Sequence, residues 1–156
     1  MRITLTLDGR HREAEVSPGE SLMDVVRRLG AKSVKNGCDN GDCGSCAVLL
    51  DGRAVNACLV FAAKAEGRTV ETAESLDRHG ELHPLQHAML DLGAVQCGFC
   101  TPGMLLITLD LLKVNPDPTE AEVREALAGT YCRCTGYVKP VEAILTAAAA
   151  MREARS

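Results

Sequence analysis

Eight cysteines, arranged as two separate groups of four, constrain this 156-residue chain more than any other feature. The first group has the spacing C-x4-C-x2-C-x11-C and consists of Cys38, Cys43, Cys46 and Cys58. The second group has the spacing C-x2-C-x31-C-x-C and consists of Cys97, Cys100, Cys132 and Cys134. No cysteine is left over, so each group offers four thiolates to one site.

Four thiolates are the ligand set of a [2Fe–2S] cluster, because each of its two irons takes two protein sulfurs to complete a tetrahedron. The C-x4-C-x2-C spacing that opens the first group is the plant-type ferredoxin spacing. Gly37, Gly41 and Gly44 lie among these cysteines, and glycine permits the sharp backbone turns that a cluster-binding loop requires. The sequence therefore predicts two [2Fe–2S] clusters and transfer of one electron at a time.

Eight cysteines have two other common uses in proteins. Four disulfides would suit a short secreted chain, but Cys132 and Cys134 are too close in sequence to join one disulfide scaffold easily. Two structural zinc ions would usually be held by pairs of short C-x2-4-C motifs. The second group has only one such motif, and the first ends in the isolated Cys58. A zinc-stabilised interaction domain without a redox role is thus a weaker hypothesis.

Charge and hydropathy limit the partners and the compartment. The net charge is −4, so no basic face indicates nucleic acid or an anionic membrane. Residues 1–7 alternate like a strand and lack the apolar core of a signal peptide, and no later run is long enough to span a membrane. The reducing cytoplasm is the expected compartment.

The pattern of elements predicts an α+β fold with a β-rich first half and a helical second half. In the first half, Asp8-Gly9 and Asp51-Gly52 are typical hairpin turns. Strands are expected at 1–7, 11–16, 47–50, 53–58 and 69–72, with one helix at 21–29. Residues 73–82 are the expected linker. Four helices follow, at 84–92, 102–114, 119–129 and 140–152, with Thr101 and Thr119 as expected N-caps.

Three motifs carry a resemblance to a known family. They read Gly37-Cys38-Asp39-Asn40-Gly41-Asp42-Cys43-Gly44-Ser45-Cys46, Gln96-Cys97-Gly98-Phe99-Cys100-Thr101-Pro102-Gly103-Met104 and Cys132-Arg133-Cys134-Thr135-Gly136-Tyr137. With these motifs the chain closely resembles the small iron–sulfur subunit of the molybdenum hydroxylases. That family includes xanthine oxidase, aldehyde oxidoreductases, aerobic carbon monoxide dehydrogenases and bacterial N-heterocycle dehydrogenases.

The resemblance implies an architecture and partners. Residues 1–75 would form a β-grasp, ferredoxin-like domain, and residues 76–156 a four-helix [2Fe–2S]-binding domain. A large subunit would hold the molybdopterin and the substrate, and a medium subunit would usually hold FAD. The assembly would be a hetero-oligomer, such as a dimer of heterotrimers. This chain would then do no substrate chemistry and have no catalytic residue of its own, although it belongs to an oxidoreductase.

The resemblance also implies roles for individual residues. The cluster on Cys97, Cys100, Cys132 and Cys134 would be the one nearer the pterin, and the cluster on Cys38, Cys43, Cys46 and Cys58 would lie on the exit side. Gln96 matches a glutamine that hydrogen-bonds the pterin, and Cys134 matches a cysteine that approaches its amino group. One departure is visible, because Thr130 stands where the family usually has asparagine. We expect ligation to be unaffected and the loop near the pterin to differ.

The sequence thus predicts an electron-transfer subunit that passes electrons from a molybdopterin partner toward FAD or an external acceptor. The alternative is a free two-cluster, ferredoxin-type shuttle. A shuttle should present an acidic docking face, whereas a built-in subunit should present an apolar one.

Overall fold

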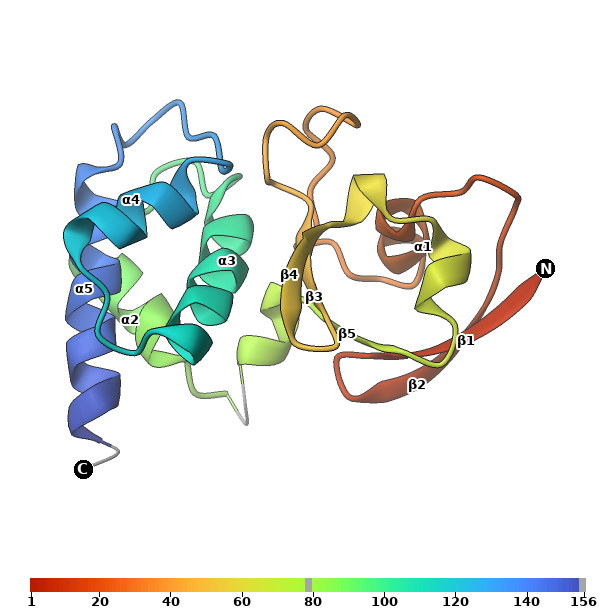
Figure 1. Cartoon of the computed structure of the whole chain (residues 1–156), viewed down its shortest axis with the longest axis horizontal. Helices are drawn as coiled ribbons and strands as arrows, with labels where there is room; N and C mark the ends of the chain where they lie inside the picture. Colours follow the sequence, from red (N-terminus) through yellow and green to blue (C-terminus); the bar gives the residue numbers. More distant parts are fainter. Residues whose placement is uncertain (78–79, 155–156) are drawn as a thin grey trace.

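The computed structural model of the chain describes residues 1–77 and 80–154. Its first half contains a mixed sheet with the strand order β2-β1-β5-β3-β4 (Figure 1). The strands are β1 (Arg2–Leu7), β2 (Arg10–Glu15), β3 (Ala47–Leu50), β4 (Arg53–Asn56) and β5 (Thr69–Glu71). β1 and β5 are parallel, while the other neighbouring strands are antiparallel. The α+β fold class expected from the sequence is confirmed.

Local sequence explains the sheet. Ile3, Leu5 and Leu7 of β1 are buried, whereas the threonines between them are only half-buried, so the strand turns one apolar face to the core. The turns at Asp8-Gly9 and Asp51-Gly52 have positive φ at both residues, the type I′ geometry that matches strand twist. Helix α1 (Leu22–Arg28) begins after Ser21, whose side chain accepts the Asp24 N–H.

The first half also contains three short 3₁₀ turns, η1 (Ala57–Leu59), η2 (Ala62–Ala65) and η3 (Ala73–Leu76). η1 stands where the end of a strand was expected, and η3 where the linker was expected. Cys58 therefore lies in η1 and not in the strand expected at 53–58, because β4 ends at Asn56. The expected linker at 73–82 begins as the ordered turn η3, and its residues 78–79 lie outside the described part of the chain.

The second half consists of the four expected helices. They are α2 (Pro84–Asp91), α3 (Thr101–Val114), α4 (Glu120–Leu127) and α5 (Val138–Glu153). α2 packs against α5, and α4 packs against both α3 and α5. The expected N-cap Thr119 forms a capping box with Glu122. The prediction that Thr101 is the N-cap of α3 is wrong, because Thr101 is already the first residue of the helix. Cys100 occupies the N-cap position, and its side chain makes no capping hydrogen bond.

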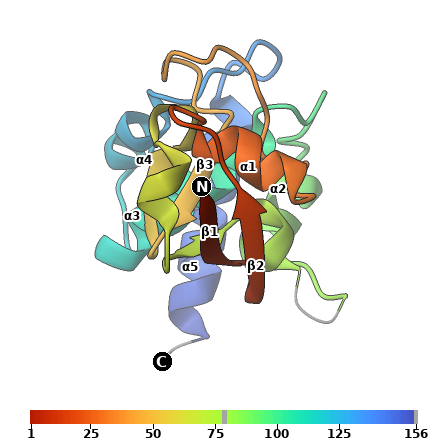
Figure 2. The same ribbon diagram turned by 90° about the vertical axis from the view of Figure 1, so that its right-hand side faces the viewer.

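Each half has its own apolar core. Leu22, Val25 and Val48 belong to the core of the sheet half, and Leu85 and Ile144 to the core of the helical half. The halves meet where α3 packs against β3 and β4. Figure 2 shows the sheet half in front of the helical half, with loops of both halves at the same end of the molecule. Within residues 1–77 and 80–154, no helix is long and apolar enough to cross a bilayer.

Candidate metal centres

The first cysteine group lies in the loop between α1 and β3 and at the end of the β3–β4 hairpin. The hairpin pairs Ala47 with Asn56, and the Ala57 N–H donates to the Cys46 carbonyl over 3.3 Å. This register places Cys46 beside Cys58, and burial together with the neighbouring Cys58 thiol raises the pKa of Cys46 to about 12. The hairpin thus brings together two cysteines that are distant in sequence.

Cys38 and Cys43 form the other pair of this group. The Cys43 N–H donates to the Cys38 sulfur over 3.4 Å. A side chain on Gly37 would place its Cβ only 2.8 Å from the Cys43 sulfur, so the close approach of that sulfur requires glycine. Backbone N–H groups of Asn40 and Cys43 lower the pKa of the Cys38 thiol to about 7, which favours the thiolate that binds metal.

The second group gathers residues from two helix junctions. Cys97 and Cys100 immediately precede α3, while Cys132 and Cys134 lie between α4 and α5. The sulfurs of Cys97 and Cys134 are 3.6 Å apart. Cys100 lies beside Cys132, and burial together with this neighbouring thiol raises the pKa of Cys100 to about 12. The structure therefore pairs each residue of the C-x2-C motif with one residue of C-x-C.

A tyrosine fixes the loop that carries Cys132. The Tyr137 hydroxyl accepts the Cys132 N–H over 2.8 Å and donates to the Thr130 carbonyl over 2.9 Å. The Cys132 sulfur also lies 3.1 Å from the Thr135 hydroxyl. Although burial opposes ionisation of Cys132, hydrogen bonds from Thr135 and neighbouring groups lower its pKa. The sequence places Tyr137 in the third motif, but it did not predict that the Tyr137 hydroxyl links Thr130 to Cys132.

The arrangement of sulfurs in pairs fits a two-iron cluster. A tetrahedral metal with thiolate bonds of about 2.3 Å places two sulfurs on the same ion about 3.8 Å apart. The 3.6 Å separation of the Cys97 and Cys134 sulfurs is close to this value. All eight cysteines are free thiols, so the structure contains no disulfide framework.

The two residues expected to face the pterin lie at the surface. Gln96 is exposed, as are the neighbouring Cys97 and, across the site, Cys134. The Gln96 side chain makes no hydrogen bond with the rest of the described chain. The second cysteine group is thus accessible from outside at the edge formed by Cys97 and Cys134.

The two groups adjoin each other, which the sequence did not indicate. The Tyr131 N–H, next to Cys132, donates to the Cys43 carbonyl of the first group over 3.0 Å. Phe99 lies between the loops, because a Cβ built on Gly37 would be 3.5 Å from its ring. Phe99 is 44% exposed and so is not a core residue.

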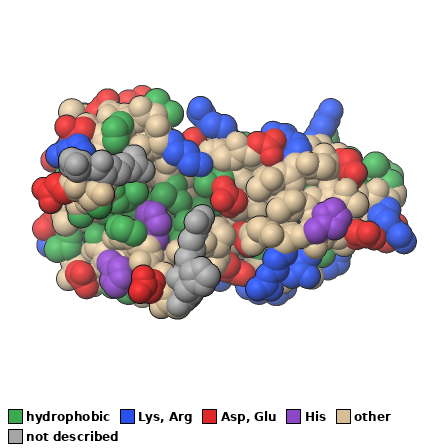
Figure 3. Space-filling view, turned by 90° about the horizontal axis from the view of Figure 1, so that it is seen from below, with side chains coloured by type: hydrophobic (Ala, Val, Ile, Leu, Met, Phe, Trp, Pro, Cys, Tyr) green, Lys and Arg blue, Asp and Glu red, His purple; other side chains and the backbone are tan. Residues whose placement is uncertain are grey.

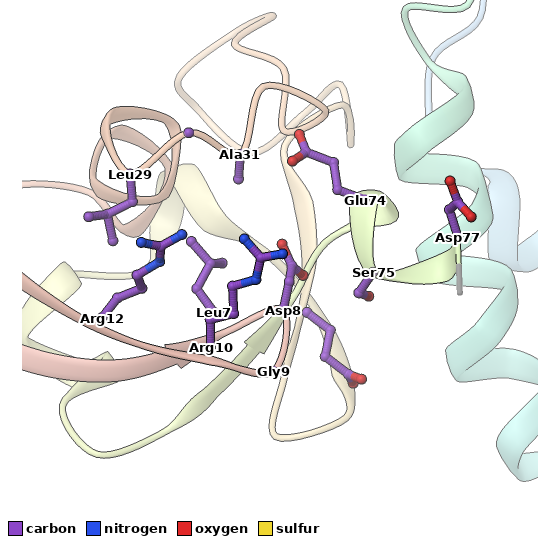
Figure 4. Close-up of a pocket in the computed structure, with 12 residues that line it drawn as sticks. Leu7, Asp8, Gly9, Arg10, Arg12, Leu29, Ala31, Glu74, Ser75 and Asp77 are labelled. Carbon is purple, nitrogen blue, oxygen red and sulfur yellow. The ribbon is translucent and has the colours of Figure 1, made fainter. Parts of the chain in front are cut away.

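A groove of about 640 Å³ lies elsewhere, between β2, the end of α1 and η3. In Figure 4 the Arg10 and Arg12 side chains extend into this groove, which Asp8 and Glu74 also line. It contains none of the eight cysteines and carries charges of both signs. The cysteine groups are therefore not organised around this groove.

Comparisons with known proteins agree with this geometry. Residues 5–77 match the family described as 2Fe-2S iron-sulfur cluster binding domain, and residues 69–145 match the [2Fe-2S] binding domain family. The chain is similar to the nicotine 6-hydroxylase small subunit of Paenarthrobacter nicotinovorans, with 46% identity over 94% of this chain and 89% of that relative. It is also similar to the xanthine dehydrogenase iron-sulfur-binding subunit of Escherichia coli O157:H7, with 44% identity over 92% and 91% of the two chains.

A solved structure extends the likeness to the whole fold. Quinoline 2-oxidoreductase from Pseudomonas putida 86 matches with a TM-score of 0.94 and 42% identity, over 100% of this chain and 98% of that one. The chain belongs to the iron–sulfur subunit family of the molybdenum hydroxylases. Like other members of this family it has two [2Fe–2S]-binding domains, and it is an electron-transfer subunit of an oxidoreductase. The alternative of a free shuttle is not favoured.

Proposed function

We propose that the eight cysteines hold two clusters, one on each group of four. The clusters supply one-electron redox chemistry, because each accepts and releases single electrons. The observation that carries the proposal is that the cysteines of each group lie in pairs. The Cys43 N–H donates to the Cys38 sulfur, and Cys46 lies beside Cys58, Cys97 beside Cys134 and Cys100 beside Cys132.

The residues around the thiols would stabilise and tune the bound clusters. The Cys43 N–H points at the Cys38 sulfur, and hydrogen bonds to ligand sulfurs are one determinant of reduction potential. At the second group, α3 starts at Thr101, so the positive end of its dipole faces the thiolates of Cys97 and Cys100. The protein would thus set the potential of each cluster by different means.

The second group would receive electrons from the molybdopterin of a large partner subunit. The exposure of Gln96 and Cys134 supports this role, because both residues are free to contact a neighbouring chain. The first group would then pass electrons toward FAD in a medium subunit or toward another acceptor. Division of the chain into domains at 1–75 and 76–156 would give each domain one cluster, which the two separate cores support.

Assembly into a hetero-oligomer, such as a dimer of heterotrimers, is also part of the proposal. Apolar side chains left on the surface support it, including Leu59, Phe61, Tyr131 and Val138. Seen from below in Figure 3, apolar side chains gather on the helical half. Eight free thiols are consistent with a reducing compartment, and we propose the cytoplasm.

The ligand assignment can be tested by metal analysis and electron paramagnetic resonance (EPR) of the complex purified with its partners. Wild-type protein should contain about four irons and four acid-labile sulfides per copy of this chain, and two distinct signals after reduction. Cys43→Ser should alter or remove one signal, and Cys100→Ser the other, so each variant is the control for the other. Zinc in place of iron, or two unchanged signals in either variant, would refute the assignment.

A further inference from the structure

The two cysteine loops touch through main-chain atoms at one place, which we name the glycine junction and define as Gly44, Gly103, Gly129 and Thr130. Gly44 follows Cys43, Gly103 lies in the first turn of α3, and the other two residues precede Cys132. Figure 1 shows both loops, orange and blue, at the same end of the molecule.

No side chain could fit within this junction at two of its positions. A Cβ on Gly103 would lie 2.4 Å from the Gly44 carbonyl oxygen, and a Cβ on Gly44 would lie 2.3 Å from the Gly129 carbonyl oxygen. Both obstacles are backbone atoms, which cannot rotate away as a flexible side chain does. Either methyl group would therefore push the two loops apart.

The other end of α3 prevents the helix from simply tilting to relieve such a clash. Asp110 accepts the Ala54 N–H over 3.2 Å and pairs with the Arg53 Nε over 3.1 Å. Lys113 donates to the Gly52 carbonyl over 3.1 Å. These contacts anchor α3 to the β3–β4 hairpin, so the helix is held at both ends against the sheet half.

We propose that Gly103 and Gly44 are positioning residues that set the separation of the two clusters. Because they lack side chains, the main chains beside Cys43 and Cys100 come into contact, and the Tyr131 N–H reaches the Cys43 carbonyl. The rate of electron transfer between two centres falls steeply with distance. The junction therefore keeps transfer between the clusters fast. This inference rests on the ligand assignment proposed above.

Gly103→Ala is the sharpest test, because the φ angle of Gly103 is an ordinary one and alanine is a better helix former than glycine. Its matched control is Gly129→Ala in the same junction, where a Cβ would meet no atom within 4 Å and φ is also not positive. Both variants would be made in the complex with its partner subunits. The readouts are iron content, the two EPR signals, and the splitting of these signals by magnetic coupling when both clusters are reduced.

We expect Gly103→Ala to keep both clusters but to narrow the splitting and slow electron transfer between them, while Gly129→Ala behaves as wild type. If Gly103→Ala does not assemble, Asp110→Ala decides the matter. It releases the end of α3 that lies away from Cys100, and the looser junction should also narrow the splitting. Wild-type splitting in a fully loaded Gly103→Ala or, failing that, Asp110→Ala protein would overturn the inference. Absence of iron from the wild type would instead overturn the ligand assignment.

Discussion

Thr130 is completely buried, and its hydroxyl has no hydrogen-bond partner within the described chain. Its side chain faces Gly44, since a Cβ there would lie 3.0 Å from the Thr130 Oγ1. A buried hydroxyl without a partner costs about 1–3 kcal/mol. We therefore expect the Thr130 hydroxyl to lower the free energy of unfolding.

Thr130→Val should remove this unpaired hydroxyl while keeping the shape of the side chain. We expect the free energy of unfolding to rise by about 1 kcal/mol, measured by denaturant titration. Thr72→Val is the matched control, because Thr72 is equally buried but its hydroxyl donates to Asp8 over 2.9 Å, and this variant should lose stability. A loss of stability in Thr130→Val would mean that its hydroxyl bonds to a group of the loaded protein, such as a cluster sulfur.

Sequence spacing singled out the candidate ligand cysteines but not their neighbours. The C-x4-C-x2-C spacing indicates a loop, and the structure places Cys38, Cys43 and Cys46 in the segment between α1 and β3. The burial of Thr130 and the tight fit of Gly103 depend on how the second half docks on the first. No local pattern encodes that docking, because the contacting residues are separated by more than fifty positions in sequence.

At the scale of elements, helix α4 shows how local signals determine structure. The Thr119 Oγ1 accepts the Glu122 N–H, while the Glu122 carboxylate accepts the Thr119 N–H over 2.7 Å. The Thr119 backbone and side-chain hydrogen bonds hold the pKa of Glu122 below its ordinary value of 4.5. A capping box satisfies two unpaired backbone N–H groups within four residues, so it can be recognised from the sequence. α3 has no side-chain cap, and the sequence therefore placed its first residue incorrectly.

Thr119→Ala should cost about 1 kcal/mol of stability at neutral pH, as loss of an N-cap does. Because the folded-state pKa of Glu122 is lowered, its carboxylate contributes to the stability of the fold at pH values above 4.5. This stabilisation is lost as the pH falls through the lower folded-state pKa. Thermal unfolding at several pH values should therefore show a smaller acid-induced loss in Thr119→Ala than in wild type. Glu125→Ala, on the same helix, is the control for loss of a side chain outside the cap and should keep wild-type stability at neutral pH. Equal stability of Thr119→Ala and wild type at neutral pH would contradict the role of the capping box.

At the scale of the whole molecule, the fold consists of two cores joined by the contact of α3 with the β3–β4 hairpin. Composition and periodicity predicted this division into a sheet half and a helical half. They did not predict the docking of α3 or the common end at which both cysteine groups lie. These features follow from packing between halves, whereas periodicity reports only which face of an element is apolar.

Two core variants can test whether the halves are separate domains. Leu127→Ala in the helical core and Leu22→Ala in the sheet core should each cost about 3 kcal/mol, because both side chains are almost fully buried. On heating, Leu127→Ala should lose the EPR signal of the second cysteine group first, and Leu22→Ala that of the first group. Simultaneous loss of both signals in both variants would indicate a single cooperative unit.

The anchoring of α3 has a consequence for how such a chain can diverge. Since backbone atoms make the tightest contacts where the loops meet, substitutions around them can change charge and polarity without altering the spacing of the redox centres. The geometry leaves no room for a side chain at Gly44 or Gly103. Electron transfer through the subunit would then tolerate many changes of its surface residues, while a single extra carbon at the junction would slow it.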